Sequence, residues 1–378
     1  MENVIYLDHA GTTRVDENVL KEMLPYLSYN YGNASSLYSI GKISRNAIEK
    51  SRMQVASAIG CNTDEIYFTS CGSESDNLAI KGIAKANKRY GKHIITSNIE
   101  HPAVLETCKT LEQEGFEVSY VPVLENGIID IDALKKLIRK DTILISIMTA
   151  NNEVGTIQPI EEIGKITRMN NIVFHTDSVQ AIGNIKIDVR RMNIDALSMS
   201  GHKFYAPKGV GALYVRNGVK FLRQQDGGHQ EKEKRAGTEN VAGIVGLGKA
   251  IEIADTNLIQ YNKHLIQLRD FYTKFVLQLF KNIHVNGEVN NRLSGNMNIS
   301  FLGYKGAEIV EKLDKKGICA SSGSACSAGL PRPSNVLMNM THNVRIAESS
   351  LRVTFGKENT TEDVERLIYA LTEILGKR

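Results

Sequence analysis

The 378-residue sequence lacks the features that define several broad protein classes. It has no run approaching the roughly 18 consecutive apolar residues that a membrane-spanning helix requires. Its first residues, MENVIYLDHAGTTRVDE, contain neither the charged nor the apolar region of a secretory signal. Charge of one sign does not dominate either, because 46 Lys and Arg balance 42 Asp and Glu along the chain. We therefore expect a cytoplasmic protein that binds neither a membrane nor nucleic acid.

Cysteine is scarce and the common metal and nucleotide motifs are missing. The five cysteines, with no CxxC pair, predict reduced thiols rather than disulfides or structural zinc; they are Cys61, Cys71, Cys108, Cys319 and Cys326. No HExxH or His/Cys cluster occurs, so we expect no protein-built metal centre. GIVGLGKA at 243–250 resembles a phosphate-binding loop, but Ala250 replaces the required hydroxyl and no strand precedes it. We interpret its glycines as helix-packing residues, and the absence of GxGxxG leaves a dinucleotide site unsupported.

The residues that are present predict an α/β protein. With 42% apolar and 23% charged residues the chain is an ordinary globular one, long enough for two domains. Short runs rich in Ile and Val alternate with amphipathic helices, which is typical of a largely parallel sheet. We expect strands at 93–97, 142–150, 172–177, 194–200 and 210–215, and helices at 102–114, 131–139 and 160–169. Residues 16–255 are predicted to form the large domain, and 1–15 with 256–378 a smaller α+β domain.

Polar segments follow several of these strands, where open α/β sheets bind ligands. They are TSCGSES at 69–75, EHPA at 100–103, ANNEVGT at 150–156, HTDSVQ at 175–180 and SGHK at 200–203. Ser73 is the expected N-cap of a helix whose positive end suits a phosphate. Lys203 follows a buried strand, and desolvation would lower its pKa from about 10.4 toward a nucleophilic amine. Taken alone, Lys203 could be a solvated surface residue; with its neighbours it suits pyridoxal 5′-phosphate, which carries an aldehyde and a phosphate.

Two further segments stand out by composition. EKEKR at 231–235 interleaves both signs of charge, and we interpret it as a solvated loop. SSGSACSAGL at 321–330 contains no charged residue and predicts a loop around Cys326. Taken alone, Cys326 could also be a small buried residue.

A collinear series of motifs gives a resemblance that covers almost the whole chain. The strings are YLDHAGTT, YGNASS, FTSCGSESDN, IITSNIEHPAV, NNEVGTIQPI, FHTDSVQAIG, SGHKFYAPKGVG, GGHQEKEKRAGTEN, SSGSACS and SSLRVTFG. The chain resembles cysteine desulfurases of the NifS/IscS type, in the class V aminotransferase group of fold-type-I pyridoxal-phosphate enzymes. The resemblance implies a large domain whose mostly parallel seven-stranded sheet is flanked by helices, beside a smaller α+β domain that carries Cys326 and Arg352.

The same resemblance implies roles for individual residues. Lys203 would hold the cofactor covalently and then move the proton of the substrate Cα. Asp177 would contact the pyridine nitrogen of the cofactor and Gln180 its ring hydroxyl. His101 would stack on the ring as a further proton carrier, and Asn152 would also contact the cofactor. The phosphate would be held by Gly72, Ser73, Ser200 and His202. Thr238 would reach the phosphate of the neighbouring subunit, which implies a homodimer. Asn152 and Arg352 would bind the substrate carboxylate.

The activity implied is conversion of L-cysteine to L-alanine. Cys326 would take the sulfur as a persulfide and supply iron–sulfur cluster assembly through a scaffold or another acceptor protein. No charged residue lies within five positions of Cys326 to favour its thiolate, so activation must come from tertiary neighbours. The alternatives are a related lyase acting on selenocysteine, a class V aminotransferase, or a catalytically idle scaffold. The other four cysteines are expected to be spectators, with Cys319 in the core.

Overall fold

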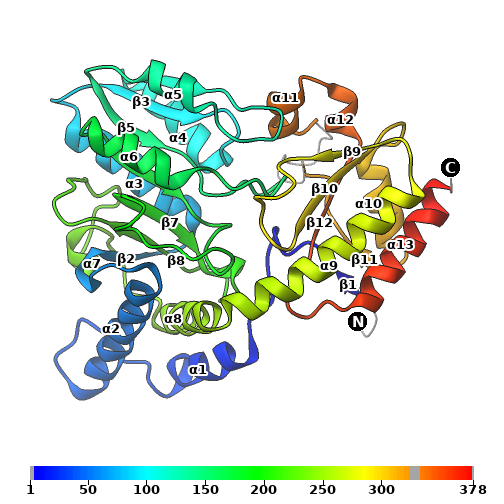
Figure 1. The fold of residues 1–378 in the computed structure, drawn as a ribbon. Helices are drawn as coiled ribbons and strands as arrows, with labels where there is room; N and C mark the ends of the chain where they lie inside the picture. Colours follow the sequence, from blue (N-terminus) through cyan, green and yellow to red (C-terminus); the bar gives the residue numbers. More distant parts are fainter. Residues whose placement is uncertain (1–3, 324–332, 377–378) are drawn as a thin grey trace.

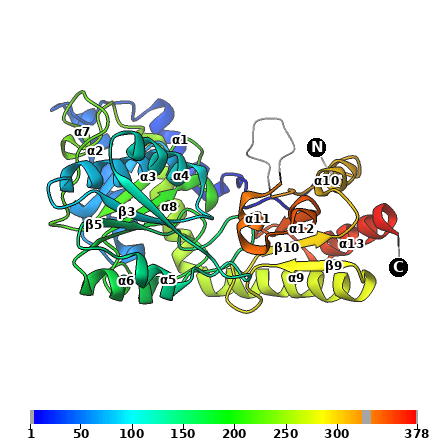
Figure 2. The ribbon, with the colours of Figure 1, turned by 90° about the horizontal axis from the view of Figure 1, so that it is seen from above.

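The computed structural model describes residues 4–323 and 333–376. Its elements form two parts that lie side by side (Figures 1 and 2), a large α/β part around a seven-stranded sheet and a smaller part around a three-stranded sheet. The long helix α9 (Leu258–Leu279) runs from the first part along the second (Figure 1). Within the described residues no helix is long and apolar enough to cross a membrane.

The large sheet has the strand order β2-β8-β7-β6-β5-β3-β4. Its strands are β2 (Ile66–Thr69), β3 (His93–Ser97), β4 (Glu117–Val121), β5 (Thr142–Ser146), β6 (Val173–Asp177), β7 (Ala196–Ser200) and β8 (Gly211–Val215). Strands β4, β3, β5, β6 and β7 pair in parallel, and only β8 runs antiparallel to both of its neighbours. The expected mostly parallel seven-stranded sheet is thus confirmed. β5 ends at Ser146 and is shorter than predicted, although Ile147 and Thr149 still donate to backbone carbonyls of β6.

Helices cover both faces of this sheet. They are α1 (Glu17–Ser28), α2 (Ser39–Ile59), α3 (Gly72–Asn87), α4 (Pro102–Gln113), α5 (Ile131–Leu137), α6 (Ile160–Met169), α7 (Gln230–Glu233) and α8 (Val241–Thr256). Helices α3 and α4 share one apolar core with the sheet, while α1, α2, α5, α6 and α8 share another. The buried aliphatic strands therefore contact apolar side chains on both faces, as a parallel sheet requires.

Local sequence signals explain two of these helices. Pro102 stands in the first turn of α4, where its missing N–H costs nothing, and Gly115 follows the helix end with a φ of +86°. In α8, an added Cβ on Gly246 would lie 2.6 Å from Met23 Sδ, and one on Gly248 2.7 Å from Ser51 Cα. The prediction that the glycines of 243–250 serve helix packing is confirmed.

The smaller part is built around an antiparallel sheet of order β12-β10-β9. Its elements are β9 (Ile283–Asn286), β10 (Asn296–Phe301), α10 (Gly306–Asp314), α11 (Asn335–Thr341), α12 (Val344–Glu348), β12 (Ser350–Thr354) and α13 (Thr361–Leu375). The N-terminal strand β1 (Ile5–Tyr6) pairs in parallel with β11 (Ile318–Cys319). The chain after β1 then runs to the large sheet. Residues from both ends of the sequence therefore meet between the two parts.

The interpretation of 231–235 as a solvated loop is wrong for its first residue. Glu231 is buried and accepts two hydrogen bonds of 2.8 Å from the guanidinium of Arg52, itself buried on α2. The same carboxylate accepts the backbone N–H of Phe68. This ion pair fastens the segment to α2, a contact across 179 positions that local charge patterning does not reveal.

Candidate active site

A cavity of about 230 Å³ opens at the ends of strands β2, β5, β6 and β7. It is lined by Ala10, Gly11, Cys71, Gly72, Ser73, Asp76, His101, Met148, Ala150, Asn152, Asp177, Val179, Gln180, Ser200, His202, Lys203 and Arg352. The structure thus brings ten of the predicted site residues to one place. Parallel strands explain this, because their carboxyl ends meet at the same edge of the sheet.

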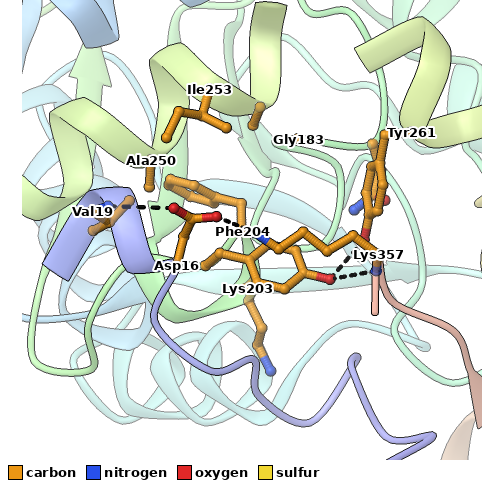
Figure 3. Close-up of a pocket in the computed structure, with 12 residues that line it drawn as sticks. Asp16, Val19, Gly183, Lys203, Phe204, Ala250, Ile253, Tyr261 and Lys357 are labelled. Carbon is orange, nitrogen blue, oxygen red and sulfur yellow. Dashed lines mark hydrogen bonds and ion pairs between the residues drawn. The ribbon is translucent and has the colours of Figure 1, made fainter. Parts of the chain in front are cut away.

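Lys203 lies in a 3₁₀ turn (Gly201–Lys203) that follows β7 directly. Its Nζ donates to the carbonyl oxygens of Ala10 and Gly11, each at 2.6 Å. A second cavity of about 60 Å³ lies behind it, among Val19, Phe204, Ala250 and other mainly apolar residues. Figure 3 shows the Lys203 amine pointing away from that second cavity. The amine is therefore directed to the N-terminal segment that forms part of the main cavity wall.

Asp177 is the last residue of β6, and its carboxylate is buried. Its Oδ1 accepts the backbone N–H of Val179 at 2.9 Å. Burial raises the pKa of Asp177, while the Val179 N–H and Lys203 act in the opposite direction. A buried carboxylate at a cavity wall suits a cationic ring nitrogen as its partner.

His101 caps helix α4, and this contact defines its tautomer. Its Nδ1 accepts the backbone N–H of Ala103 at 3.1 Å, so a neutral ring carries its proton on Nε2. Burial lowers the pKa of His101, which favours that neutral ring. His202 is also neutral, because burial and, to a smaller extent, Lys203 lower its pKa to about 4. Its Nδ1 lies 3.0 Å from Thr12 Oγ1. Both imidazoles therefore act as neutral groups near pH 7.

The first turn of helix α3 provides the anion-binding end of the cavity. The helix begins at Gly72 and its N-cap is Cys71, whose side chain makes no capping hydrogen bond. The expectation of Ser73 as N-cap is wrong, because Ser73 lies one residue inside the helix. An added Cβ on Gly72 would lie 2.6 Å from Val179 Cγ2 and 3.3 Å from Ser200 Cβ. The uncapped N–H groups and the absent side chain leave a cradle that fits a phosphate.

Arg352 reaches the cavity from strand β12 of the smaller part. Its guanidinium forms a 2.7 Å ion pair with Asp8 and donates to the Asn152 carbonyl oxygen at 3.2 Å. Its buried Nε has no hydrogen-bond partner. Gln180 is placed by a 3.0 Å hydrogen bond from its Nε2 to the Ala10 carbonyl. A planar cation with a donor left over suits recognition of a substrate carboxylate.

Two predicted residues do not join this group. Thr238 is exposed and lies outside the part of the cavity lining that the structure describes. Cys326 lies in 324–332, outside the described residues. Among the other cysteines, burial raises the pKa of the Cys61 and Cys108 thiols to about 12. Cys71, expected to be a spectator, lines the cavity.

The sequence reasoning missed Asp8 and Asp76. Asp76 is buried at the cavity wall one helical turn after Gly72, and that spacing in TSCGSESD could have indicated it. Asp8 orients Arg352 across 344 positions, and no local pattern reveals such a contact. The described residues contain no group of three or more metal-binding side chains. The donor set is instead an amine, a buried carboxylate and a phosphate cradle, which fits pyridoxal 5′-phosphate.

Comparisons with known proteins agree with this geometry. The family described as Aminotransferase class-V matches residues 5–367. A protein of Methanosarcina thermophila named cysteine desulfurase IscS is 52% identical over 99% of this chain and 92% of its own length. One of the same name from Clostridium botulinum is 48% identical over 100% of this chain and 96% of its own length.

Solved structures show the same likeness. A structure titled NifS-like protein superimposes with a TM-score of 0.93 and 39% identity, covering 99% of both chains. One titled SspA in complex with cysteine gives a TM-score of 0.84 and 37% identity, over 94% of this chain and 100% of its own. Fold and site together define a pyridoxal-phosphate enzyme of fold type I. The chain belongs to the class V aminotransferase family.

Proposed function

We propose that this protein is a cysteine desulfurase that converts L-cysteine to L-alanine and passes the sulfur to Cys326 as a persulfide for iron–sulfur cluster assembly. The observation that carries the proposal is a single cavity that joins Lys203, Asp177, Arg352 and the open end of helix α3. Curated relatives up to 52% identical over nearly the whole chain bear that name. An aminotransferase or an idle scaffold is less well supported by the same comparisons.

Each group of the cofactor has cavity residues whose chemistry suits it. The N–H groups of Gly72 and Ser73, together with Ser200 and His202, would hold the phosphate. Asp177 would hold the protonated ring nitrogen, Gln180 the ring hydroxyl, and His101 and Asn152 would contact the ring. When bound, pyridoxal 5′-phosphate supplies a ring that accepts the negative charge developing at the substrate Cα.

Lys203 and Arg352 would both act on the substrate. The Lys203 amine, held 2.6 Å from two carbonyl oxygens, would attach the resting cofactor and later move the Cα proton. Arg352, with Asn152 beside it, would bind the substrate carboxylate, and Asp8 fixes the orientation of the guanidinium. Binding the carboxylate in one orientation would also fix the position of the substrate sulfur.

The sulfur step would belong to Cys326. Its thiolate forms an S–S bond with the substrate sulfur while the carbon–sulfur bond breaks. The electron pair of the broken bond stays with the carbon skeleton, which gains a proton at Cβ and leaves as alanine. An acceptor protein, such as an iron–sulfur scaffold, would then take the outer sulfur from the Cys326 persulfide.

Two substitutions test this assignment. We expect Lys203→Ala to lose the visible absorbance of the bound cofactor. We expect Cys326→Ser to keep that absorbance while production of alanine falls by at least about 100-fold, because a hydroxyl cannot accept sulfur as a persulfide. Cys61→Ala is the matched control and should behave as wild type. Mass spectrometry after incubation with cysteine should show the added sulfur at Cys326; full activity of Cys326→Ser would refute the nucleophile assignment.

We also propose that the active form is a homodimer. Large apolar side chains are exposed between positions 24 and 43, namely Leu24, Leu27, Tyr29, Tyr31, Leu37, Tyr38, Ile40 and Ile43. Such an apolar surface marks a protein interface. The Arg52–Glu231 ion pair holds the segment before Thr238 against helix α2, which also carries Ile40 and Ile43 of this surface. A second copy seated there would let Thr238 of each chain reach the other's phosphate cradle.

The proposal also covers the domain boundaries, the substrate and the compartment. Residues 16–255 would form the cofactor domain, and 1–15 with 256–378 the small domain that carries Cys326 and Arg352. L-Cysteine would be the substrate and the cytoplasm the compartment. Competition between cysteine and selenocysteine for the same enzyme tests whether the sulfur substrate is preferred.

A further inference from the structure

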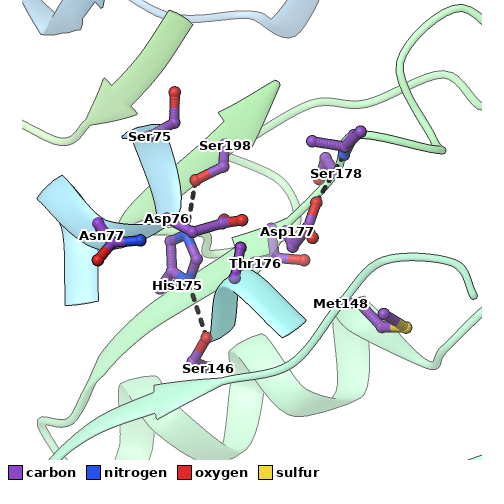
Figure 4. Close-up of polar contacts among 12 residues, drawn as sticks. Ser75, Asp76, Asn77, Ser146, Met148, His175, Thr176, Asp177, Ser178 and Ser198 are labelled. Carbon is purple, nitrogen blue, oxygen red and sulfur yellow. Dashed lines mark hydrogen bonds and ion pairs between the residues drawn. The ribbon is translucent and has the colours of Figure 1, made fainter. Parts of the chain in front are cut away.

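A buried acid that the mechanism above does not use lies in the cofactor cavity. Asp76 stands in the second turn of helix α3, is 1% exposed and lines the cavity together with Asp177. Its Oδ1 is buried without a hydrogen-bond partner. Figure 4 shows its side chain extending from the helix toward Asp177. Two carboxyl groups therefore share the wall where the cofactor ring would lie.

His175, on strand β6 beneath Asp76, does not supply a compensating positive charge. His175 Nε2 is 3.7 Å from Asp76 Oδ1, too far for a hydrogen bond. The two ring nitrogens of His175 are already engaged, Nδ1 with Ser146 Oγ at 2.8 Å and Nε2 with Ser198 Oγ at 2.9 Å (Figure 4). Burial lowers the pKa of His175 to about 3, so this ring is neutral. The histidine fills the space beneath Asp76 without supplying charge.

The described ionisable groups that act most strongly on Asp76 are acids. Asp177, Glu100 and the Cys71 thiol each oppose its ionisation, and burial adds the largest effect in the same direction. A hydrogen bond from Ser198 favours the ionised form but is outweighed, so the pKa of Asp76 lies well above its usual range. Burial raises the pKa of Asp177 as well, but Asp177 differs from Asp76 because the Val179 N–H donates to its Oδ1 and Lys203 favours its charged form. When two acids share one buried site, their pKa values move apart, so that one acid keeps its proton and the other loses it.

We propose that Asp76 is a positioning residue that holds a proton at the cofactor wall, so that the buried pair of carboxyls carries one negative charge, located on Asp177. That single charge is what a protonated ring nitrogen can neutralise. Ionisation of both acids would leave an uncompensated charge in the cavity. The inference rests on the proposed cofactor but not on cysteine as the substrate.

Infrared difference spectroscopy of the holoenzyme labelled with ¹³C-aspartate tests the proposal. Wild type at pH 7 should show a carbonyl stretch from a protonated aspartic acid, and Asp76→Asn should lose it. Asp76→Asn should also retain cofactor and titrate its absorbance as wild type does, because an amide is neutral like the protonated acid.

Several results would overturn the proposal. They are survival of the labelled acid band in Asp76→Asn, or an absorbance titration in Asp76→Asn displaced by more than one pH unit. If Asp76→Asn does not fold, labelled wild type decides alone: the band at pH 7 supports the proposal and its absence refutes it. None of these readouts depends on sulfur transfer, so they are independent of the Cys326 test.

Discussion

At the scale of single residues, burial sets the protonation states on which this site depends. It keeps His101 and His202 neutral, so that neither ring adds a positive charge to the cavity. It also raises the pKa of carboxyls around the cavity, among them Glu100. The chemistry of the site is therefore coupled to protein stability through the same buried groups.

Glu100 gives a prediction about stability and pH. The residue is 3% exposed, and burial raises its pKa from 4.5 to about 8 although Ser97 and the Met148 N–H both donate to Oε1. Between those values the unfolded chain releases the proton and the folded chain keeps it, so the free energy of unfolding falls as the pH rises. Since one pKa unit corresponds to about 1.4 kcal/mol, the whole loss is about 5 kcal/mol, of which about 4 kcal/mol falls between pH 5 and pH 9.

The substitution Glu100→Gln should remove this loss. The free energy of unfolding, measured by chemical denaturation, should be compared for the variant and wild type at pH 5 and at pH 9. Relative to wild type, the variant should be up to about 4 kcal/mol more stable at pH 9 than it is at pH 5. Glu106→Gln is the control, because Glu106 is exposed on helix α4 and should leave the pH profile unchanged. An equal difference between Glu100→Gln and wild type at both pH values would contradict the prediction.

At the scale of elements, the ends of helices α3 and α4 do most to shape the site. Each helix begins directly at the cavity, α3 with Gly72 and α4 with the capping His101. Strands β6 and β7 supply Asp177 and the turn that carries Lys203. Backbone position, rather than side-chain chemistry alone, therefore selects the residues that reach the cofactor.

The close contact at Gly72 predicts a loss of cofactor affinity on substitution. Gly72→Ala would place a methyl group 2.6 Å from Val179 Cγ2 and 3.3 Å from Ser200 Cβ, so the first turn of α3 must move away from both side chains. We expect affinity for pyridoxal 5′-phosphate to fall by at least about 10-fold, or about 1.4 kcal/mol. Cofactor titration of the apoenzyme measures this. Lys85→Ala, farther along α3, should bind as wild type does.

His101 combines capping with a place in the cavity, and two substitutions separate these roles. Asn is a good N-cap, so His101→Asn should keep the thermal stability of wild type while losing activity. His101→Ala should lose both activity and about 1 kcal/mol of stability. Thermal unfolding and alanine production measure the two effects. If His101→Asn were as active as wild type, the ring would have no part in the reaction.

At the scale of the whole molecule, the site is assembled from distant segments. Asp8 and Arg352 meet across 344 positions, and Lys203 contacts Ala10 and Gly11 across more than 190. The N-terminal segment thus links the large sheet to strand β12 of the smaller part. Activity should therefore depend on how the two parts are held together.

The proposed dimer gives the prediction at this scale. Leu37 is 82% exposed in the apolar surface before helix α2, and Leu37→Glu would place a charge in the interface. We expect the variant to shift toward monomer in analytical ultracentrifugation and to release cofactor more readily, because Thr238 of the partner subunit would be lost. Leu277→Glu is the control, since Leu277 is exposed on α9 outside this surface. An unchanged dimer in Leu37→Glu would place the interface elsewhere.

Much of the fold and site could be predicted from the sequence because the signals are local. Aliphatic runs gave the strands at 93–97 and 210–215, and Pro102 and Gly115 marked the ends of one helix. Polar segments directly after strands identified residues from His101 to Lys203, since strand ends of a parallel sheet share one edge. The N-cap of α3 was misplaced by two residues, because small polar residues at Cys71, Gly72 and Ser73 give similar local signals.

The sequence by itself determined the α/β class, the order of the elements and the reactive side chains at strand ends, because each follows from periodicity or from short motifs. Only the tertiary structure decided which of these groups line the cavity and which distant groups contact one another. It placed Asp76 beside Asp177, paired Asp8 with Arg352 and buried Glu231 against Arg52. The physical reason is that burial, and the proton positions it sets, depends on segments brought together only by folding.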